Sequence, residues 1–137
     1  MWLINELKNE LCPDMSYEDI VDLAKNSNFD ETVDANDEVF FSPVSMKSAF
    51  DKKTSSNLDT YDDYFRCAYR SLALCYKNAI EELERNTKKE YKKIYIVGGG
   101  AKNEYLNSLT KEYTNKEIIA LPIEATALGN LKVQMEV

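Results

Sequence analysis

The sequence predicts a mostly helical α/β protein whose centre is a two-stranded parallel β-α-β unit. An apolar, β-branched run, Ile94 to Val97, stops at three consecutive glycines and is followed at once by a helical pattern. A second β-branched run, residues 117–121, follows that helix. Because strand-helix-strand crossovers are right-handed in nearly all proteins, the two strands should be parallel neighbours. Both strand-to-helix turns should then lie at one edge of the sheet.

Length and composition narrow the class of protein. A chain of 137 residues suffices for one domain, or part of one, with a modest core. It carries 24 Asp and Glu against 17 Lys and Arg, a formal charge of -7, which disfavours nucleic acid as a partner. No apolar run approaches the roughly 20 residues needed to cross a bilayer. We therefore expect a soluble, cytoplasmic protein without membrane or nucleic-acid partners.

Side chains with catalytic chemistry are few. The sequence has no histidine, so the commonest general base and metal ligand is missing. The three cysteines, Cys12, Cys67 and Cys75, show no metal-ligand spacing. Cys67 and Cys75 lie eight positions apart on one expected helix, about 12 Å, which is too far for a disulfide. Chemistry must therefore rest on carboxylates, backbone amides or residues outside this chain.

The first 59 residues predict two helices followed by an irregular segment. Apolar spacing indicates a helix over residues 1–11, and Ser16 can cap a second over 16–26. From Phe29 to Asp59 the sequence shows no helical or strand periodicity, because most residues are polar and the apolar ones are isolated. A structureless segment of that length is uncommon in a compact domain, so it either lies pinned over the surface by its aromatic residues or covers a site.

Residues 60–137 predict a long helix followed by a β-α-β-α unit. Apolar residues keep helical spacing from Thr60 to about Arg85, and one such face is far more typical of core packing than of a ligand site. Further helices are expected over 103–113 and 124–131. We interpret the whole chain, 1–137, as a single partial domain with five helices.

The glycine turn Gly98-Gly99-Gly100 is the strongest candidate for a binding site. Glycine lets another group approach the backbone closely, and the amides that open the next helix carry the positive end of its dipole. Such a turn suits a phosphate. The turn matches the dinucleotide fingerprint only in part, because Asn103 stands where a third glycine belongs, and no Walker loop follows. The residues alone leave phosphate binding and a plain tight turn both open.

Two motifs resemble the C-terminal end of the FGGY sugar kinases, members of the actin, hexokinase and Hsp70 ATPase superfamily. The first is Ile96-Val97-Gly98-Gly99-Gly100-Ala101-Lys102-Asn103, and the second is Pro122-Ile123-Glu124-Ala125-Thr126-Ala127-Leu128-Gly129-Asn130. The resemblance is close after Ile94 and looser before it. Within the family, the chain looks most like members that act on L-rhamnulose.

The resemblance implies a fold, a cofactor and a set of site residues. The fold would be part of a ribonuclease-H-like, actin-type ATPase domain without its opening antiparallel strands. The cofactor would be ATP with Mg, and the cofactor-binding residues would be Gly98, Gly99, Gly100 and Asn103. The family's sugar-contacting residues and catalytic aspartate would lie before this chain, so no catalytic residue and no metal ligand is assigned.

Two functions remain open from the sequence. The chain would be part of an ATP-dependent kinase for a sugar such as L-rhamnulose, supplying the adenine-nucleotide side of the cleft, or a noncatalytic truncated remnant that only associates with itself or a partner. We expect a homodimer, or association with the missing half of the kinase, because unpaired strand edges and the apolar face of the long helix favour association. The alternative is a monomer in which Phe40, Phe41 and Phe50 cover that face.

Overall fold

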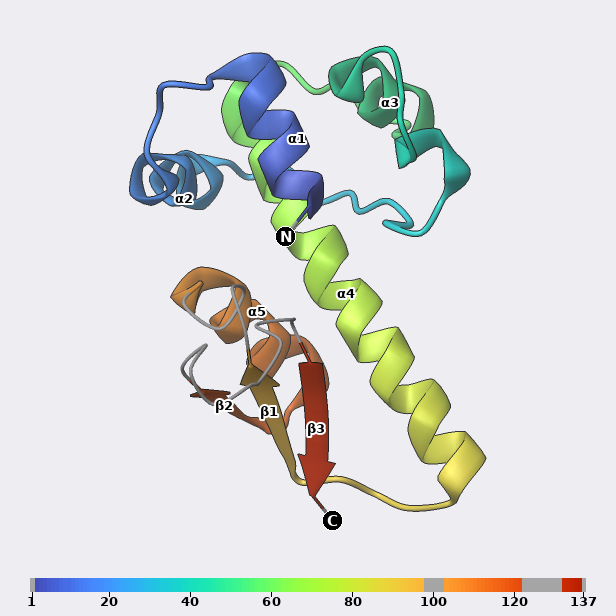
Figure 1. Ribbon diagram of the computed structural model, residues 1–137. Coiled ribbons are helices and arrows are strands. Elements are labelled where there is room, and N and C mark those ends of the chain that lie inside the picture. Colours follow the sequence, from blue (N-terminus) through green and yellow to red (C-terminus); the bar gives the residue numbers. More distant parts are fainter. Residues whose placement is uncertain (1, 98–102, 122–131, 137) are drawn as a thin grey trace. The chain divides into compact units, whose positions relative to one another are not determined.

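The computed structural model describes residues 2–97, 103–121 and 132–136 (Figure 1). The chain forms two compact units, residues 1–75 and residues 76–137, and each is described here by itself. Helix α4, Tyr61–Thr87, contributes its first part to the first unit and its second part to the second. The predicted division at residue 59 and the assignment of one partial domain to 1–137 stay predictions.

The first unit begins with the two helices that the sequence predicts. Helix α1 spans Trp2–Leu11 and helix α2 spans Tyr17–Asn26. The Ser16 hydroxyl caps α2 by accepting a hydrogen bond from the Asp19 amide at 3.2 Å. Ile20 and Ala24 of α2 are fully buried, so its apolar face lies in the core as expected.

The segment predicted to be irregular contains two short helices. A 3-10 helix, η1, spans Glu38–Phe40, and helix α3 spans Met46–Lys53. Ser45 caps α3, its hydroxyl accepting from the Ser48 amide at 3.2 Å. Helix α3 has only eight residues, and its buried positions stand among lysines and serines. Its helical pattern is therefore too short to separate from the polar sequence around it.

Aromatic residues of that segment cover the first part of α4. Phe40 and Phe50 are fully buried with their ring centroids 4.9 Å apart, and Phe50 meets Tyr64 edge to face at 6.4 Å. These contacts confirm the covering role expected in the alternative for Phe40 and Phe50, whereas Phe41 is 55% exposed. The α4 face therefore does not present the apolar patch that supported a homodimer. The oligomeric state itself stays a prediction.

The second unit holds a three-stranded sheet with strand order β2-β1-β3 (Figure 1). Strands β1, Lys93–Val97, and β2, Glu117–Leu121, are parallel, which confirms the predicted pair. Strand β3, Lys132–Glu136, pairs antiparallel with the other side of β1. The expectation of only two strands was thus wrong: the alternation of Val133 and Met135 with polar neighbours is a strand pattern. An open edge was expected at Ile94 to Val97 or at Glu117 to Leu121: among the described strands β1 has a neighbour on each side, whereas β2 lies at the edge of the sheet.

A small apolar core supports this sheet. Ile80 of α4 packs with Ile94 and Ile96 of β1, and the half-buried Ile118 of β2 joins them. Helix α5, Glu104–Thr114, buries Leu106 and Leu109. The described helices and strands make the chain mostly helical, as predicted. The predicted helix over 124–131 lies outside the described residues.

Candidate functional site

The predicted nucleotide site follows the carboxyl ends of two parallel strands. The register pairs Val97 with Leu121, so β1 and β2 end side by side at one edge of the sheet. In the sequence, Val97 comes directly before the glycine turn and Leu121 directly before the second family motif. Gly98, Gly99 and Gly100 lie outside the described residues. Ligands of parallel α/β sheets bind beyond this edge, so the topology is the one that the predicted site requires.

Asn103 is the one predicted site residue that the structure describes. It is the N-cap of α5, and its side-chain oxygen Oδ1 accepts a hydrogen bond from the Leu106 amide at 2.8 Å. The side chain therefore fixes where α5 begins after the glycine turn. Its predicted place beside the adenine or ribose stays a prediction.

The opposite ends of the two strands are tied by a partly buried ion pair. The Lys116 ammonium lies 2.9 Å from Glu84 Oε2 and donates to the Tyr91 carbonyl at 2.5 Å. The Tyr91 amide donates to the same Glu84 oxygen at 2.9 Å. The hydrogen bond from Lys116, followed by that from Tyr91, lowers the pKa of Glu84. The cluster joins the end of α4 to the starts of β1 and β2, which holds the strand pair in register.

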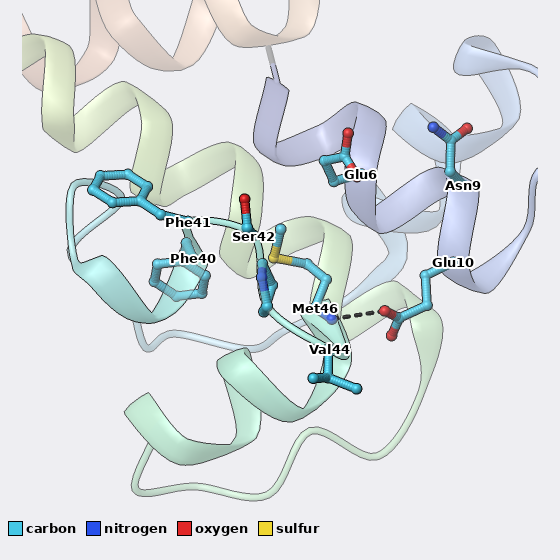
Figure 2. A pocket seen from close by; sticks show the side chains of 9 residues that line it. Glu6, Asn9, Glu10, Phe40, Phe41, Ser42, Val44 and Met46 are labelled. Carbon is cyan, nitrogen blue, oxygen red and sulfur yellow. Dashed lines mark hydrogen bonds between the residues drawn. The ribbon is translucent and has the colours of Figure 1, made fainter.

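A second candidate site is a hollow in the first unit, with a volume of about 620 Å³ (Figure 2). Helix α1 forms one wall and the connection from η1 to α3 the other. Phe40 and Met46 are buried beneath it, whereas Phe41 and Val44 stand exposed at its rim. The lining residues are Glu6, Asn9, Glu10, Phe40, Phe41, Ser42, Pro43, Val44 and Met46.

One wall of the hollow is joined to the other by Glu10. Its carboxylate accepts from the Met46 amide at 2.7 Å, the Lys47 amide at 2.9 Å and the Ser45 hydroxyl at 2.9 Å. Burial raises the pKa of Glu10, but these hydrogen bonds outweigh it and lower the pKa below its ordinary value. The carboxylate therefore lies at the N-terminus of α3, where the helix dipole favours a negative charge.

Sequence reasoning missed both the hollow and this contact. Glu10 lies 35 positions from Ser45 along the chain, so no local spacing connects them. The only local signal was Ser45 before an apolar position, which is a weak helix start. Among the described residues, no group of His, Cys, Asp and Glu side chains could hold a metal ion, and no helix is long and apolar enough to cross a membrane.

Comparison with known proteins decides the family. The C-terminal domain of the FGGY family of carbohydrate kinases matches residues 2–136. The chain belongs to this family. The resemblance inferred from the two motifs is thus confirmed, and the match extends back through α1 and the segment that follows α2.

Several curated FGGY relatives carry the same name. A rhamnulokinase of Bacillus subtilis (strain 168) is 38% identical over 98% of this chain. Rhamnulokinases of Oceanobacillus iheyensis and Enterococcus faecalis are 36% and 37% identical over the same share. The chain spans 29 to 30% of the length of these relatives. The match therefore covers their C-terminal domain region and leaves most of each relative without a counterpart.

Proposed function

We propose that this chain supplies the adenine-nucleotide side of an ATP-dependent sugar kinase that phosphorylates L-rhamnulose. The observation that carries the proposal is the agreement of its relatives: proteins named rhamnulokinase match 98% of the chain at 34 to 38% identity. The noncatalytic alternative has no observation that favours it.

The described residues fit a nucleotide at the edge where β1 and β2 end. The start of α5 follows the glycine turn, so the positive end of the helix dipole lies on the side where phosphates would bind. Gly98, Gly99 and Gly100 would let the phosphates approach the backbone, and Asn103 would lie beside the adenine or ribose. ATP supplies the phosphoryl group, and its accompanying Mg would be held by the phosphates and by residues outside this chain.

The finer fold assignment belongs to the same proposal. We infer part of a ribonuclease-H-like, actin-type domain, supported by the parallel pair β1-β2 with helix α5 between its strands in the chain. The sugar-binding domain and the catalytic aspartate would be supplied by the portion that precedes the matched region in the relatives. Phosphoryl transfer depends almost wholly on positioning and charge stabilisation, so both walls of the cleft are needed.

The glycine turn provides the test of nucleotide binding. The chain is fused behind the preceding portion of the Bacillus subtilis relative, and ADP binding is measured by calorimetry. Gly99→Val places a β-branched side chain where the phosphates should approach, and we expect roughly a tenfold or greater loss of affinity.

The matched control adds the same side chain on the exposed surface of α5. Ser108→Val should leave the affinity for ADP unchanged, because Ser108 lies in the middle of the helix, away from its start. Unchanged ADP affinity in Gly99→Val, with an intact circular dichroism spectrum, would overturn the assignment of the turn.

A further inference from the structure

The first unit holds another hollow, lined mainly by polar side chains, which we call the polar pocket. Its volume is about 300 Å³. Lys47 and Asp51 of α3 form one wall, Tyr64 near the start of α4 lies behind them, and residues 56–59 of the connection between the two helices form the other wall. Sites for small molecules begin at roughly this volume. The polar pocket therefore suits a ligand no larger than a single sugar ring.

A carboxylate and an ammonium group lie side by side on the α3 wall. The hydroxyl of the buried Tyr64 donates to Asp51 Oδ1 at 2.5 Å, which orients the carboxylate. Burial, followed by this hydrogen bond, raises the pKa of Tyr64, so the phenol keeps its proton. The other oxygen, Asp51 Oδ2, lies 3.6 Å from Lys47 Nζ. Both side chains are nearly half exposed, so a ligand can reach them.

The separation of this ion pair leaves hydrogen-bonding capacity unused. A distance of 3.6 Å between Lys47 Nζ and Asp51 Oδ2 is too long for a direct hydrogen bond. A polar contact of that length is one that a bridging group can complete. The ammonium only donates and the carboxylate only accepts, whereas a hydroxyl does both. A ligand hydroxyl would therefore accept from Lys47 and donate to Asp51 at the same time.

The connection that forms the other wall is held at both ends. The Glu31 carboxylate accepts from the amides of Ser55 and Ser56 at 2.7 and 2.8 Å. The Asp59 amide donates to Asp63 Oδ2 at 3.1 Å. Because these bonds fix the backbone before a ligand arrives, little ordering is needed on binding.

Charge excludes an anion as the preferred ligand. Among the lining residues, all of which the structure describes, Lys47 is the one cation, whereas Asp51 and Asp59 are both anions. The walls therefore carry one negative charge in excess, which disfavours a phosphate ester or a carboxylate. Ser56 and Asn57 add a hydroxyl and a carboxamide without further charge. This combination favours a neutral ligand with several hydroxyls.

We propose that the polar pocket binds a neutral monosaccharide or polyol, one hydroxyl of which bridges Lys47 Nζ and Asp51 Oδ2. Further hydroxyls would bond to Ser56, Asn57 and Asp59. The site lies within the first unit and involves no residue of the proposed nucleotide edge. Sugar binding here and ADP binding at the glycine turn are therefore separate results.

A titration followed by nuclear magnetic resonance tests the site. The ¹⁵N-labelled 137-residue chain is titrated separately with glycerol, D-glucose and L-rhamnose, and its amide shifts are recorded. We expect at least one of the three to give saturable shifts with half-saturation at roughly 1 to 10 mM, because the contacts are few and polar. The shifts should be largest at Asp51 and at residues 56–59.

Two substitutions probe the bridging hydroxyl. Lys47→Met removes the ammonium from a chain of similar length, and Asp51→Asn keeps an acceptor for Tyr64 but puts an NH₂ group where the ligand hydroxyl should donate. Each should weaken binding by roughly tenfold, since a charged hydrogen-bond partner is lost. The matched controls are Lys52→Met on α3 and Asp22→Asn on α2. Both residues are exposed and neither lines the polar pocket, so affinity should be unchanged.

D-Glucose 6-phosphate tests the charge argument. It carries the sugar ring of D-glucose with an added anion, and it should bind several-fold more weakly than D-glucose.

Three results would overturn the proposal. The first is the absence of saturable shifts at the polar pocket with all three neutral compounds. The second is retained affinity in either Lys47→Met or Asp51→Asn, with circular dichroism showing the variant folded. The third is tighter binding of D-glucose 6-phosphate than of D-glucose, which would assign the polar pocket to an anion instead.

Discussion

Glu10 shows how a single carboxylate can hold a segment that has little secondary structure. It reaches from α1 to the first turn of α3 and accepts hydrogen bonds from Met46, Lys47 and Ser45. Glu31 does the same for the amides of Ser55 and Ser56, at 2.7 and 2.8 Å. Hydrogen bonds from these amides lower the pKa of Glu31. Two carboxylates therefore anchor residues before and after α3.

Replacement of Glu10 should destabilise the first unit in a pH-dependent way. Glu10→Gln removes the charge from the start of α3. We expect a loss of only about 1 kcal/mol in the free energy of unfolding at neutral pH, because water screens this exposed carboxylate. The folded pKa of Glu10 lies below its ordinary value of 4.5, so its stabilisation is present above that value. It is lost as the pH falls through the folded pKa.

Urea unfolding of the native chain and of Glu10→Gln at several pH values measures this loss. The difference between the two proteins should shrink as the pH falls from 4.5 through the lower, folded pKa of Glu10, below which both side chains are neutral. Glu6→Gln on the same helix is the control and should leave the unfolding free energy nearly unchanged. An equal difference at all pH values would contradict a role for the charge.

Cys67 should be chemically silent in the folded protein. It is fully buried in α4, and burial raises the pKa of its thiol to about 12, against a smaller opposing effect of the hydrogen bond with Ser71. The reactive thiolate is then scarce at neutral pH. Alkylation by iodoacetamide at pH 8, followed by mass spectrometry, should modify Cys12 and Cys75, which are partly exposed, well before Cys67. Equal rates at all three would show that the first part of α4 is accessible.

At the level of the element, Asn103 caps the start of α5, and we propose that it also lies beside the nucleotide. Asn103→Ala removes the cap, and we expect the second unit to lose about 1 kcal/mol of stability. Asn103→Asp keeps a capping oxygen, so the stability should be retained, while the added charge should weaken ADP binding in the fused kinase. Thermal unfolding and calorimetry of both variants separate the two roles. Unaltered ADP affinity in Asn103→Asp would confine the residue to capping.

The elements that the sequence predicted are the ones with a sustained local pattern. Helix α4 keeps its apolar spacing over many turns, and Ile94 and Ile118 stand in β-branched runs that end at glycines or proline. Helix α3 is stabilised by contacts with residues distant in the sequence, such as Glu10. The local sequence pattern carries no sign of these contacts. Strand β3 pairs with β1, which lies far from it in the sequence. Its alternation of apolar and polar residues is only five residues long, so the local pattern is weak.

The candidate site was predictable for a different reason. The glycine turn and the motif after β2 were identified because they resemble a family, and the parallel pairing of the strands that precede them follows from chain order. The hollow beside Glu10 was not predictable, since it lies between segments brought together only by folding. The sequence left two alternatives for the apolar face of α4, self-association or covering by aromatic residues such as Phe40 and Phe50. Composition alone could not choose between them.

For the whole molecule, we expect the 137-residue chain to show no kinase activity by itself. The residues proposed for the nucleotide would form one wall of the cleft, and the sugar and catalytic groups would belong to the other portion. Purified chain with ATP and L-rhamnulose should form ADP no faster than the buffer blank in a coupled assay. Turnover above that blank, abolished by Gly99→Val, would contradict this expectation.

The segment between α2 and α4 should tolerate insertions and deletions, because only a few side-chain contacts hold it. The carboxylates of Glu10 and Glu31 hold this segment by hydrogen bonds to a few backbone amides. Its described residues form no β-strand. Residues added or removed between those points would lengthen or shorten a loop without shifting any register, at a cost that grows only slowly with loop length. Family members should therefore differ most freely in length here, while the spacing from β1 to α5 stays constant.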